Sequence, residues 1–400
     1  MPLDPTDAPS SRAQRLGEVA RYFTQLGFTA FGGPAAHIAL MERQLVEQRR
    51  WLDRQHFLDA LSAINLIPGP NSTQLAITIG YLRAGLPGLF AAGICFIFPA
   101  VLIILPIAYA YVEFGQTPHA AAAMHGVAAA VLAVIAVALV RLAKTSVANS
   151  FQATIAIAAA LAAIVIHYEG LAAADPLILL AAAVAGVLRA SPRARQFVPM
   201  FLPLPLAAAI AQPAGLTLMA LLFLKIGATL YGSGYLLLPY LQANFVGGHA
   251  WLTNRQLLDA VAVGQVTPGP LLTTATFIGF LVGFHTTPAG SLPLALAGAI
   301  IATAAIFGPS FLFIAVLGKL LPRLRNHPAA RGALDAMNAA VLALIAVALC
   351  QLAPPALRPP GTLVWVTIFA ATLLVLLRWD VNATWPILAA AAIGLVAGAT

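Results

Sequence analysis

Charged side chains are scarce in this sequence of 400 residues. Only 8% of the residues are charged, whereas 61% are hydrophobic. An ordinary soluble domain carries roughly a quarter charged residues, and so few could not cover a water-exposed surface of this size. This scarcity excludes a water-soluble globular enzyme, and the high apolar content excludes a disordered chain. In a membrane, the length suffices for about ten helices of roughly 20 residues each.

Cysteines and catalytic motifs are also few. The two cysteines, Cys95 and Cys350, lie inside apolar runs, so no disulfide framework or thiolate metal site is predicted. The chain contains no Walker-type loop, no HExxH, no nucleophile elbow and no Cys/His metal spacing. We therefore expect a protein that is not an enzyme, with no catalytic residue, no metal and no cofactor.

The chain has long apolar runs instead, and several are long enough to cross a hydrocarbon core, which takes about 20 residues. They cover 85–112, 121–141, 151–168, 173–188, 291–317, 335–351, 361–377 and 383–399. No alternating strand pattern accompanies them, so the sequence predicts an all-α polytopic membrane protein. Residues 1–16 lack the apolar core of a signal peptide and are expected to form a cytoplasmic tail.

The net charge of +8 comes from basic residues that lie mostly in loops. On a soluble protein, such a charge is typical of nucleic-acid binding, but here it matches the basic cytoplasmic loops of a membrane protein. The expected surroundings are therefore a lipid bilayer, with no nucleic-acid partner. The sequence leaves open whether the chain forms a homodimer.

The chain repeats itself at a spacing of 200 residues. The repeated positions include Phe23 and Phe223, Gly27 and Gly227, Trp51 and Trp251, Asp59 and Asp259, and two Pro-Gly-Pro triplets, Pro68-Gly69-Pro70 and Pro268-Gly269-Pro270. Further along, AAVLAVIAVAL at 129–139 recurs as AAVLALIAVAL at 339–349, now 210 residues away. Chance similarity of two apolar helices would not preserve such residues at fixed spacing.

The loop charges indicate that the two repeats are inverted. In the first, basic loops at Arg83, at 141–144 and at 189–195 alternate with the loops 113–120 and 167–175, which contain no Lys or Arg. In the second, the pattern is exchanged, because 283–293 contains no Lys or Arg and 319–331 is basic. We therefore predict repeats at 17–196 and 216–400, joined by a connecting span at 197–215. Inverted repeats are typical of secondary transporters.

Each repeat contains a helix interrupted by Pro-Gly-Pro. About 13 helical residues on either side give roughly 20 Å, which is too short to cross the membrane. Segments 54–84 and 254–284 are therefore predicted to be re-entrant hairpins with the triplets at their tips. Positions 53 and 83 are expected on the cytoplasmic side, and 253 and 284 outside. One long kinked helix is the alternative.

Polar residues follow each triplet, where a helix begins. Asn71, Ser72, Thr73 and Gln74 follow the first, and Thr273, Thr274 and Thr276 follow the second. The first N–H groups of a helix lack intrahelical partners and attract anions. Asn71, Ser72, Thr73, Thr273 and Thr274 are therefore the candidate substrate ligands. Capping by Asn71 or Ser72 alone is the other interpretation.

Glycines mark a second interruption in each repeat, with Gly32 and Gly33 in the first and Gly232 and Ser233 in the second. They are candidate substrate contacts, because glycine admits unusual backbone geometry and close approach of a ligand. They also suit close helix packing.

Ionisable residues within the apolar segments are candidates by default. Lys225 could neutralise an anion or extend to the membrane interface. Asp59 and Asp259 are candidates for coupling or for a structural role, and Asp53 and Thr253, six positions before them, are expected to be the N-caps of the same helices. His37 could titrate or donate to a substrate.

These segments resemble the chromate ion transporter family in its two-domain form, over essentially the whole chain. The resemblance rests on FTAFGGPAAHIALM at 28–41, WLDRQHFLDALSAINLIPGPNSTQLAITIGY at 51–81, and FLKIGATLYGSGYLLLPYL with WLTNRQLLDAVAVGQVTPGPLLTTATFIG in the second half. It implies an inner-membrane protein that exports chromate and confers chromate resistance. Sulfate, a close analogue, is an alternative substrate, and an anion channel is an alternative mechanism.

Overall fold

The computed structural model describes residues 11–65, 67–115, 117–168, 175–190, 215–231, 234–287, 290–317, 328–358, 362–379 and 381–397. Throughout these ranges the regular structure is helical, which confirms the predicted all-α class. The predicted connecting span at 197–215 lies almost wholly outside the described residues.

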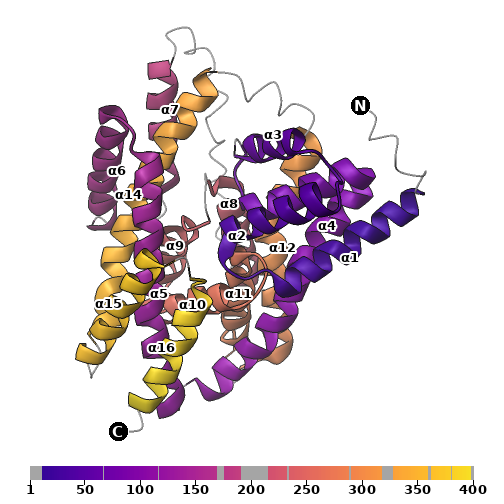
Figure 1. The fold of residues 1–400 in the computed structure, drawn as a ribbon. Helices are drawn as coiled ribbons and strands as arrows, with labels where there is room; N and C mark the ends of the chain where they lie inside the picture. The colour runs from indigo at the N-terminus through magenta and orange to yellow at the C-terminus, as the bar shows by residue number, and fades with distance from the viewer. Residues whose placement is uncertain are drawn as a thin grey trace.

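The first half of the chain forms one series of helices (Figure 1). In order, they are α1 (Arg12–Thr29), α2 (Gly33–Met41), the π-helical η1 (Glu42–Gln48), α3 (Arg54–Ile64), α4 (Asn71–Phe114), α5 (Pro118–Ser146), α6 (Ser150–Tyr168) and α7 (Asp175–Ala190). Helix α1 begins at Arg12 behind a capping box formed by Ser11 and Gln14. The tail expected through residue 16 is therefore helical from residue 12, because this box supplies a helix start.

The second half repeats this order. It contains α8 (Leu216–Thr229), α9 (Leu237–Leu241), the π-helical η4 (Gln242–Gly248), α10 (Asn254–Val266), the 3₁₀ turn η5 (Leu271–Thr273), α11 (Thr274–Phe284), α12 (Leu292–Leu317), α14 (Pro328–Leu357), α15 (Thr362–Arg378) and α16 (Thr384–Ala397). The correspondence extends to single residues, since Arg50 and Ala250 adopt the same left-handed conformation, with φ of 52° and 51°.

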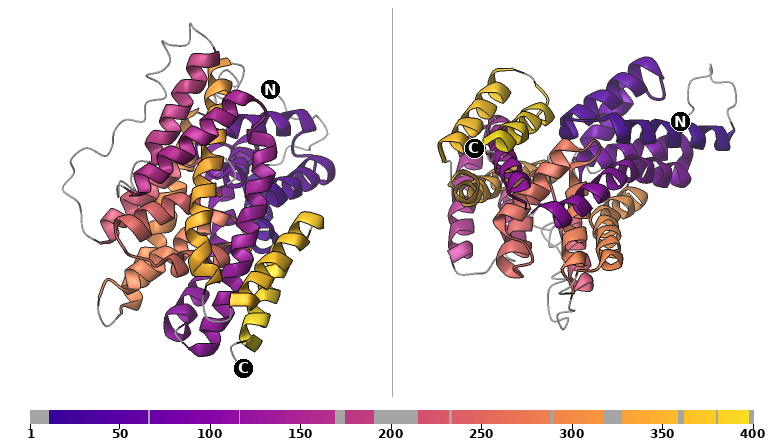
Figure 2. Two further views of the ribbon diagram at one scale, coloured as in Figure 1. Left: turned by 90° about the vertical axis from the view of Figure 1, so that its left-hand side faces the viewer. Right: turned by 90° about the horizontal axis from the view of Figure 1, so that it is seen from below.

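The two halves interlock. Helix α14 of the second half packs on α6 and α7 of the first, and α5 packs on the equivalent α15 and α16. Small residues permit the close approach, since Gly332 of α14 lies against Gly186 of α7, and Gly394 of α16 lies against Ala122 of α5. The equivalent helices α5 and α14 run in opposite directions, which is the arrangement expected of inverted repeats (Figures 1 and 2).

Four of the described helices are long and apolar enough to cross a membrane by themselves: α4, α5, α12 and α14. Shorter apolar helices, α6, α7, α8, α11, α15 and α16, accompany them. Large apolar side chains remain exposed along several of these helices, among them Ile157, Leu161, Ile300, Leu312 and Leu363. Exposed apolar surface of this extent suits a lipid environment rather than water.

The segment predicted as the first re-entrant hairpin folds back on itself. Helix α3 ends at Ile64, and α4 begins at Asn71 behind Pro68-Gly69-Pro70. The Arg83 guanidinium then lies 5.3 Å from the ring centroid of Trp51, so the chain has returned to its starting point. Non-helical backbone at Ala84 and Gly85 turns it again, and Gly80 packs against Gly88. The single kinked crossing is therefore not what forms.

Both hairpins begin at the side-chain caps that the sequence suggests. Asp53 accepts the backbone N–H of His56 at 2.8 Å, and Thr253 accepts that of Gln256 at 3.1 Å. These bonds satisfy N–H groups that a helix start leaves unpaired. For Asp53, the bonds from the backbone and ring of His56 hold the pKa of the exposed carboxyl below its usual range.

The mirrored caps allow a test of the inversion. In a chain with Cys95→Ala and Cys350→Ala, we expect Asp53→Cys to react with a membrane-impermeant thiol reagent only from the cytoplasm, and Thr253→Cys only from outside. Right-side-out and inside-out vesicles distinguish the two faces. Labelling of both positions from one side would contradict the inverted arrangement.

Candidate functional site

Each hairpin tip hydrogen-bonds to a helix end in the other half of the chain. The Gly69 N–H donates to the carbonyl of Leu230 at 2.5 Å, and the Gly269 N–H donates to that of Ala30 at 2.9 Å. Ala30 and Leu230 are equivalent positions, where α1 and α8 end in extended backbone. The sequence predicts all four interruptions, but not that they would pair crosswise between the halves.

The crosswise pairing has a simple physical basis. The last carbonyls of a helix lack intrahelical donors, and a tip glycine offers an N–H that no helix uses. Gly69 and Gly269 have φ of 138° and 96°, in the region that favours glycine. Space at both tips is also tight, since a Cβ on Gly69 would lie 2.6 Å from Ser310 Oγ, and one on Gly269 would lie 2.9 Å from Ala100 Cβ.

Unpartnered polar atoms gather at the first tip. Thr73 Oγ1, Gln74 Oε1 and Ser310 Oγ are buried and make no hydrogen bond to any residue that the structure describes. All three residues are fully buried, with relative exposures of 0%. Gln74 also donates through Nε2 to the Pro68 carbonyl at 2.7 Å, which fixes its amide beside Gly69. Buried polar groups are normally paired, so these three atoms make the first tip the candidate site for a polar ligand.

The capping interpretation of the first tip is wrong. The N-cap of α4 is Pro70, which provides no side-chain bond, and Asn71 donates its amide to Asn65 at 2.8 Å instead. Ser72 is buried within the same first turn. The positive end of α4 therefore remains available near Thr73 and Gln74.

The second tip has the same backbone but satisfies its own hydroxyls. Thr273 Oγ1 donates to the Pro270 carbonyl at 2.6 Å, and Thr274 Oγ1 donates to that of Leu271 at 2.9 Å. Ala100 takes the place that Ser310 has at the first tip. The two tips, which are alike in sequence pattern, therefore differ in the polar atoms that they leave unpaired.

Ser310 is not among the substrate residues that the sequence predicts. Aligning the halves at the later spacing of 210 residues places Pro309 over Pro99 and Ser310 over Ala100. The sequence signal for Ser310 is that one half has a serine where the other half has an alanine at the equivalent helix position. The unpartnered oxygen of Gln74 could come only from the structure.

The first glycine interruption forms as predicted. Gly32 and Gly33 have φ of 101° and 77°, and α2 begins there. His37 of α2 is fully buried, with Nε2 at 3.1 Å from the Ala30 carbonyl and Nδ1 unpartnered. It thus contacts the carbonyl that Gly269 uses, and lies behind the second tip.

Three further residues that the sequence predicts as substrate contacts are Lys225, Gly232 and Ser233. Lys225 is half-buried on α8, four residues before Thr229, whose hydroxyl donates to the Lys225 carbonyl. Gly232 and Ser233 lie outside the described residues. In the part of the chain that the structure describes, no group of three or more His, Cys, Asp or Glu side chains could hold a metal ion.

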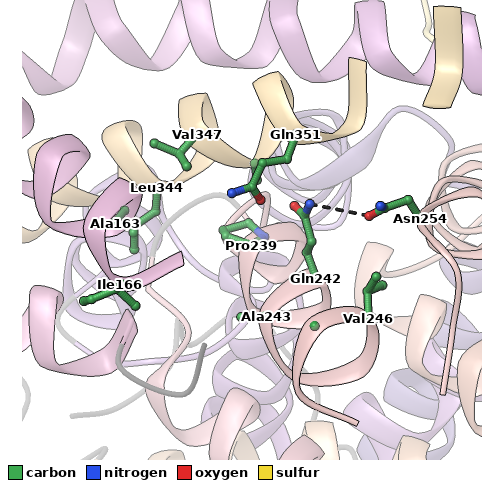
Figure 3. A pocket seen from close by; sticks show the side chains of 12 residues that line it. Ala163, Ile166, Pro239, Gln242, Ala243, Val246, Asn254, Leu344, Val347 and Gln351 are labelled. Atoms are coloured by element: carbon green, nitrogen blue, oxygen red, sulfur yellow. Dashed lines mark hydrogen bonds between the residues drawn. The ribbon is translucent and has the colours of Figure 1, made fainter. Parts of the chain in front are cut away.

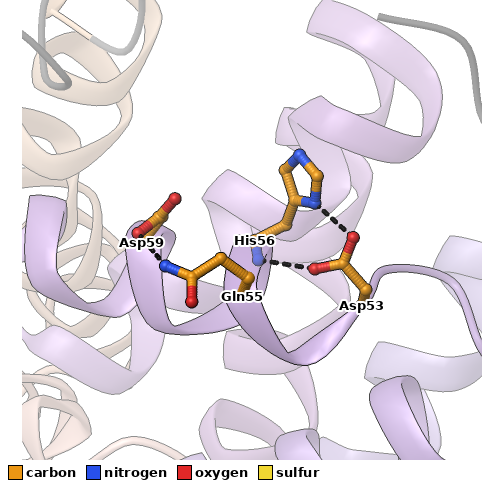
Figure 4. A network of polar contacts seen from close by, with 4 residues as sticks. All are labelled: Asp53, Gln55, His56 and Asp59. Atoms are coloured by element: carbon orange, nitrogen blue, oxygen red, sulfur yellow. Dashed lines mark hydrogen bonds and ion pairs between the residues drawn. The ribbon is translucent and has the colours of Figure 1, made fainter.

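The equivalent carboxylates Asp59 and Asp259 have different surroundings. Asp59 is half-buried and accepts the Gln55 amide at 3.0 Å, beside the exposed contact between Asp53 and His56 (Figure 4). Asp259 is fully buried and accepts the Tyr111 hydroxyl at 2.7 Å, while its Oδ1 is unpartnered.

A separate cavity of about 120 Å³ lies between α6, α9, η4 and α14 (Figure 3). Three amide side chains face it, from Gln242, Asn254 and Gln351. Gln242 and Asn254 are 3.5 Å apart, whereas the equivalent Glu42 and Arg54 form an ion pair at 3.6 Å. The second half thus has neutral amides where the first half has charges.

Comparison with known proteins gives consistent matches along the chain. The model of the family described as Chromate transporter matches residues 17–187 and 217–395. A chromate transport protein of Cupriavidus metallidurans is 32% identical over 96% of this chain and 93% of its own length. One from Pseudomonas aeruginosa is 31% identical over 93% and 90%, respectively. A probable chromate transport protein of Synechococcus elongatus is 33% identical over 76% of each chain. No solved structure matches.

Proposed function

The chain belongs to the chromate transporter family, and from that premise we propose that it is a secondary transporter that exports chromate by alternating access. Export would confer chromate resistance. The proposal places the protein in the bacterial inner membrane with its N-terminus in the cytoplasm, in accord with the basic loops. A homodimer is compatible with this proposal but is not required by it.

The observation that carries the proposal is the crosswise contact of the hairpin tips, with unpartnered polar atoms at one of them. Gly69 and Gly269 each bond to the opposite half, so movement of one half against the other must break or remake these bonds. A tetrahedral oxyanion suits the first tip, because Thr73 and Ser310 can donate hydroxyl protons to it. The N-terminus of α4 adds partial positive charge.

Burial of the first tip also requires that the two halves move before a substrate can bind. Thr73, Gln74 and Ser310 are buried, so an oxyanion reaches them only after the tip separates from α8 and α12. Breaking the bond between Gly69 and Leu230 on one side of the membrane, and that between Gly269 and Ala30 on the other, would expose the site alternately. This is the gating expected of inverted repeats around a central site.

Flux of labelled chromate and sulfate in membrane vesicles tests the proposal. We expect saturable chromate transport that is accelerated by chromate on the opposite side, because a carrier returns faster when loaded. Sulfate is the alternative substrate and would compete. Chromate flux that rises without saturation and shows no exchange would instead support an anion channel, and the absence of chromate flux would overturn the proposal.

A further inference from the structure

Asp259 is a buried carboxylate that the candidate substrate site does not use. It lies in the second turn of α10, in the arm of the second hairpin that precedes the tip. Among the described residues, its one hydrogen-bond partner is Tyr111 of α4, and Oδ1 has none. A buried carboxylate without a compensating cation is stable only when it carries a proton.

A guanidinium lies nearby but is engaged elsewhere. Arg255 precedes Asp259 by one helical turn, yet its Nη2 donates to the Ala121 carbonyl at 2.8 Å, and its Nη1 lies 3.1 Å from His125 Nε2. Since a guanidinium only donates, His125 accepts through Nε2 and is neutral. Arg255 thus connects the second hairpin to α5 rather than to Asp259.

The equivalent pair in the first half makes the contact that Arg255 and Asp259 do not. Gln55 and Asp59 occupy the same two positions on α3, and the Gln55 amide donates to Asp59 at 3.0 Å. Side chains four residues apart on a helix are neighbours, so Arg255 can reach Asp259 by changing rotamer. Arg255 therefore has two alternative sets of partners: Ala121 and His125 of α5, or the carboxylate of Asp259.

Few other charged groups lie on the described elements that pack against α10. Facing Asp259 are Tyr111 from α4 and Arg255 from its own helix, with His125 of α5 beyond Arg255. The other elements packed on α10 are η4, η5, α11, α14 and α16. Over their described bounds, η4, η5, α11 and α16 contain no charged residue, and those of α14, Arg331 and Asp335, lie in its first turns.

We propose that Asp259 binds the proton that is coupled to oxyanion movement, and that Arg255 converts loss of this proton into movement of the second hairpin. Oδ1 takes a proton from water on one side of the membrane and returns it to water on the other. With the proton bound, Arg255 holds α10 to α5 through Ala121 and His125. With the proton lost, the carboxylate draws Arg255 away and releases the hairpin. This inference rests on the transport function proposed above.

Proteoliposomes that contain the full chain test the coupling. With the membrane potential held at zero, one proton carried per cycle allows a gradient of one pH unit to support about tenfold accumulation of labelled chromate. Asparagine is neutral like the protonated carboxyl and should leave Arg255 on α5, so we expect Asp259→Asn to abolish both this accumulation and chromate exchange at every pH. Asp59→Asn is the matched control, since its partly exposed carboxyl has an amide partner, and we expect it to accumulate chromate as the wild type does.

A second variant guards against loss of folding. Tyr111→Phe keeps the carboxyl but removes a hydrogen bond that favours its charged form, so the pH profile of chromate exchange should move to higher pH. An unchanged profile would contradict the role of Asp259. The same conclusion would follow if Asp259→Asn accumulated chromate normally, or if the wild type exchanged chromate but ignored the pH gradient.

Infrared spectroscopy separates failure of the coupling from failure of the transport function. We expect the purified wild type to show the carbonyl band of a buried protonated carboxyl, and Asp259→Asn to lack it. If the wild type carries no chromate at all, the proposed function is wrong, and the band alone decides whether Asp259 holds a proton. A wild-type spectrum identical to that of the variant would overturn the proton site.

Discussion

Gly69→Ala is expected to reduce chromate flux to about a tenth of the wild-type rate or less. Gly69 has φ of 138°, where a non-glycine residue costs roughly 1–3 kcal/mol. Its new Cβ would also clash with Gln74 Nε2 and lie 2.6 Å from Ser310 Oγ. Since about 1.4 kcal/mol corresponds to a tenfold change in an equilibrium, strain and clash together should depopulate the closed tip.

Gly308→Ala is the matched control for this effect. Gly308 lies in α12 near Ser310, and a Cβ there would meet no atom within 4 Å. Because alanine favours helix over glycine, we expect wild-type flux and equal or slightly higher stability. Flux in vesicles, normalised to the amount of folded protein, gives the comparison. Normal flux in Gly69→Ala would show that closure of the first tip is not needed for transport.

Ser310→Ala is expected to raise the KM for chromate by roughly 10- to 100-fold, which corresponds to loss of one hydrogen bond to a charged ligand at about 1.5–3 kcal/mol. The folded protein should not lose stability, since Ser310 Oγ has no partner. Removing an unpaired buried hydroxyl is neutral or stabilising. A higher KM with an unchanged or higher Tm is a combination that a purely structural role does not produce.

The second tip provides the control for this prediction. Thr274→Val removes a hydroxyl that bonds to the Leu271 carbonyl. We therefore expect a lower Tm and a nearly unchanged KM, the opposite pattern to Ser310→Ala. Vesicle flux gives the KM values, and thermal unfolding in detergent gives the Tm values. Equal KM values for Ser310→Ala and the wild type would remove Ser310 from the site.

The sequence predicts much of the scaffold because its signals are local or repeated. Helices follow from apolar runs, and both hairpins from Pro-Gly-Pro between segments too short to cross. The caps at Asp53 and Thr253 follow from residue type, since each bonds to the N–H three residues later. The loop charges predict the inversion, and the opposite directions of α5 and α14 agree with it (Figure 1).

Two features do not follow from the local sequence: the pairing of the tips, and the difference in hydrogen-bond partners between equivalent polar residues. Gly69 meets Leu230, 161 residues further along the chain, and no short pattern specifies that contact. Thr73 and Thr273 look equivalent in sequence, yet only Thr273 finds a carbonyl acceptor. Likewise, Asp59 and Asp259 repeat, but burial beside Tyr111 distinguishes the second. Such differences depend on packing between the halves.

Equilibrium binding of radiolabelled chromate to the purified protein tests the central claim most directly, because it separates binding at the first tip from the movements of transport. The comparison is between the wild type, the double variant Thr73→Val with Ser310→Ala, and the mirrored variant Thr273→Val with Thr274→Val. We predict that the first double variant binds at least about tenfold more weakly, from the loss of two donors to a charged ligand, while the mirrored variant binds as the wild type does. Wild-type affinity in the first double variant, or weaker binding only in the mirrored one, would contradict the proposed site.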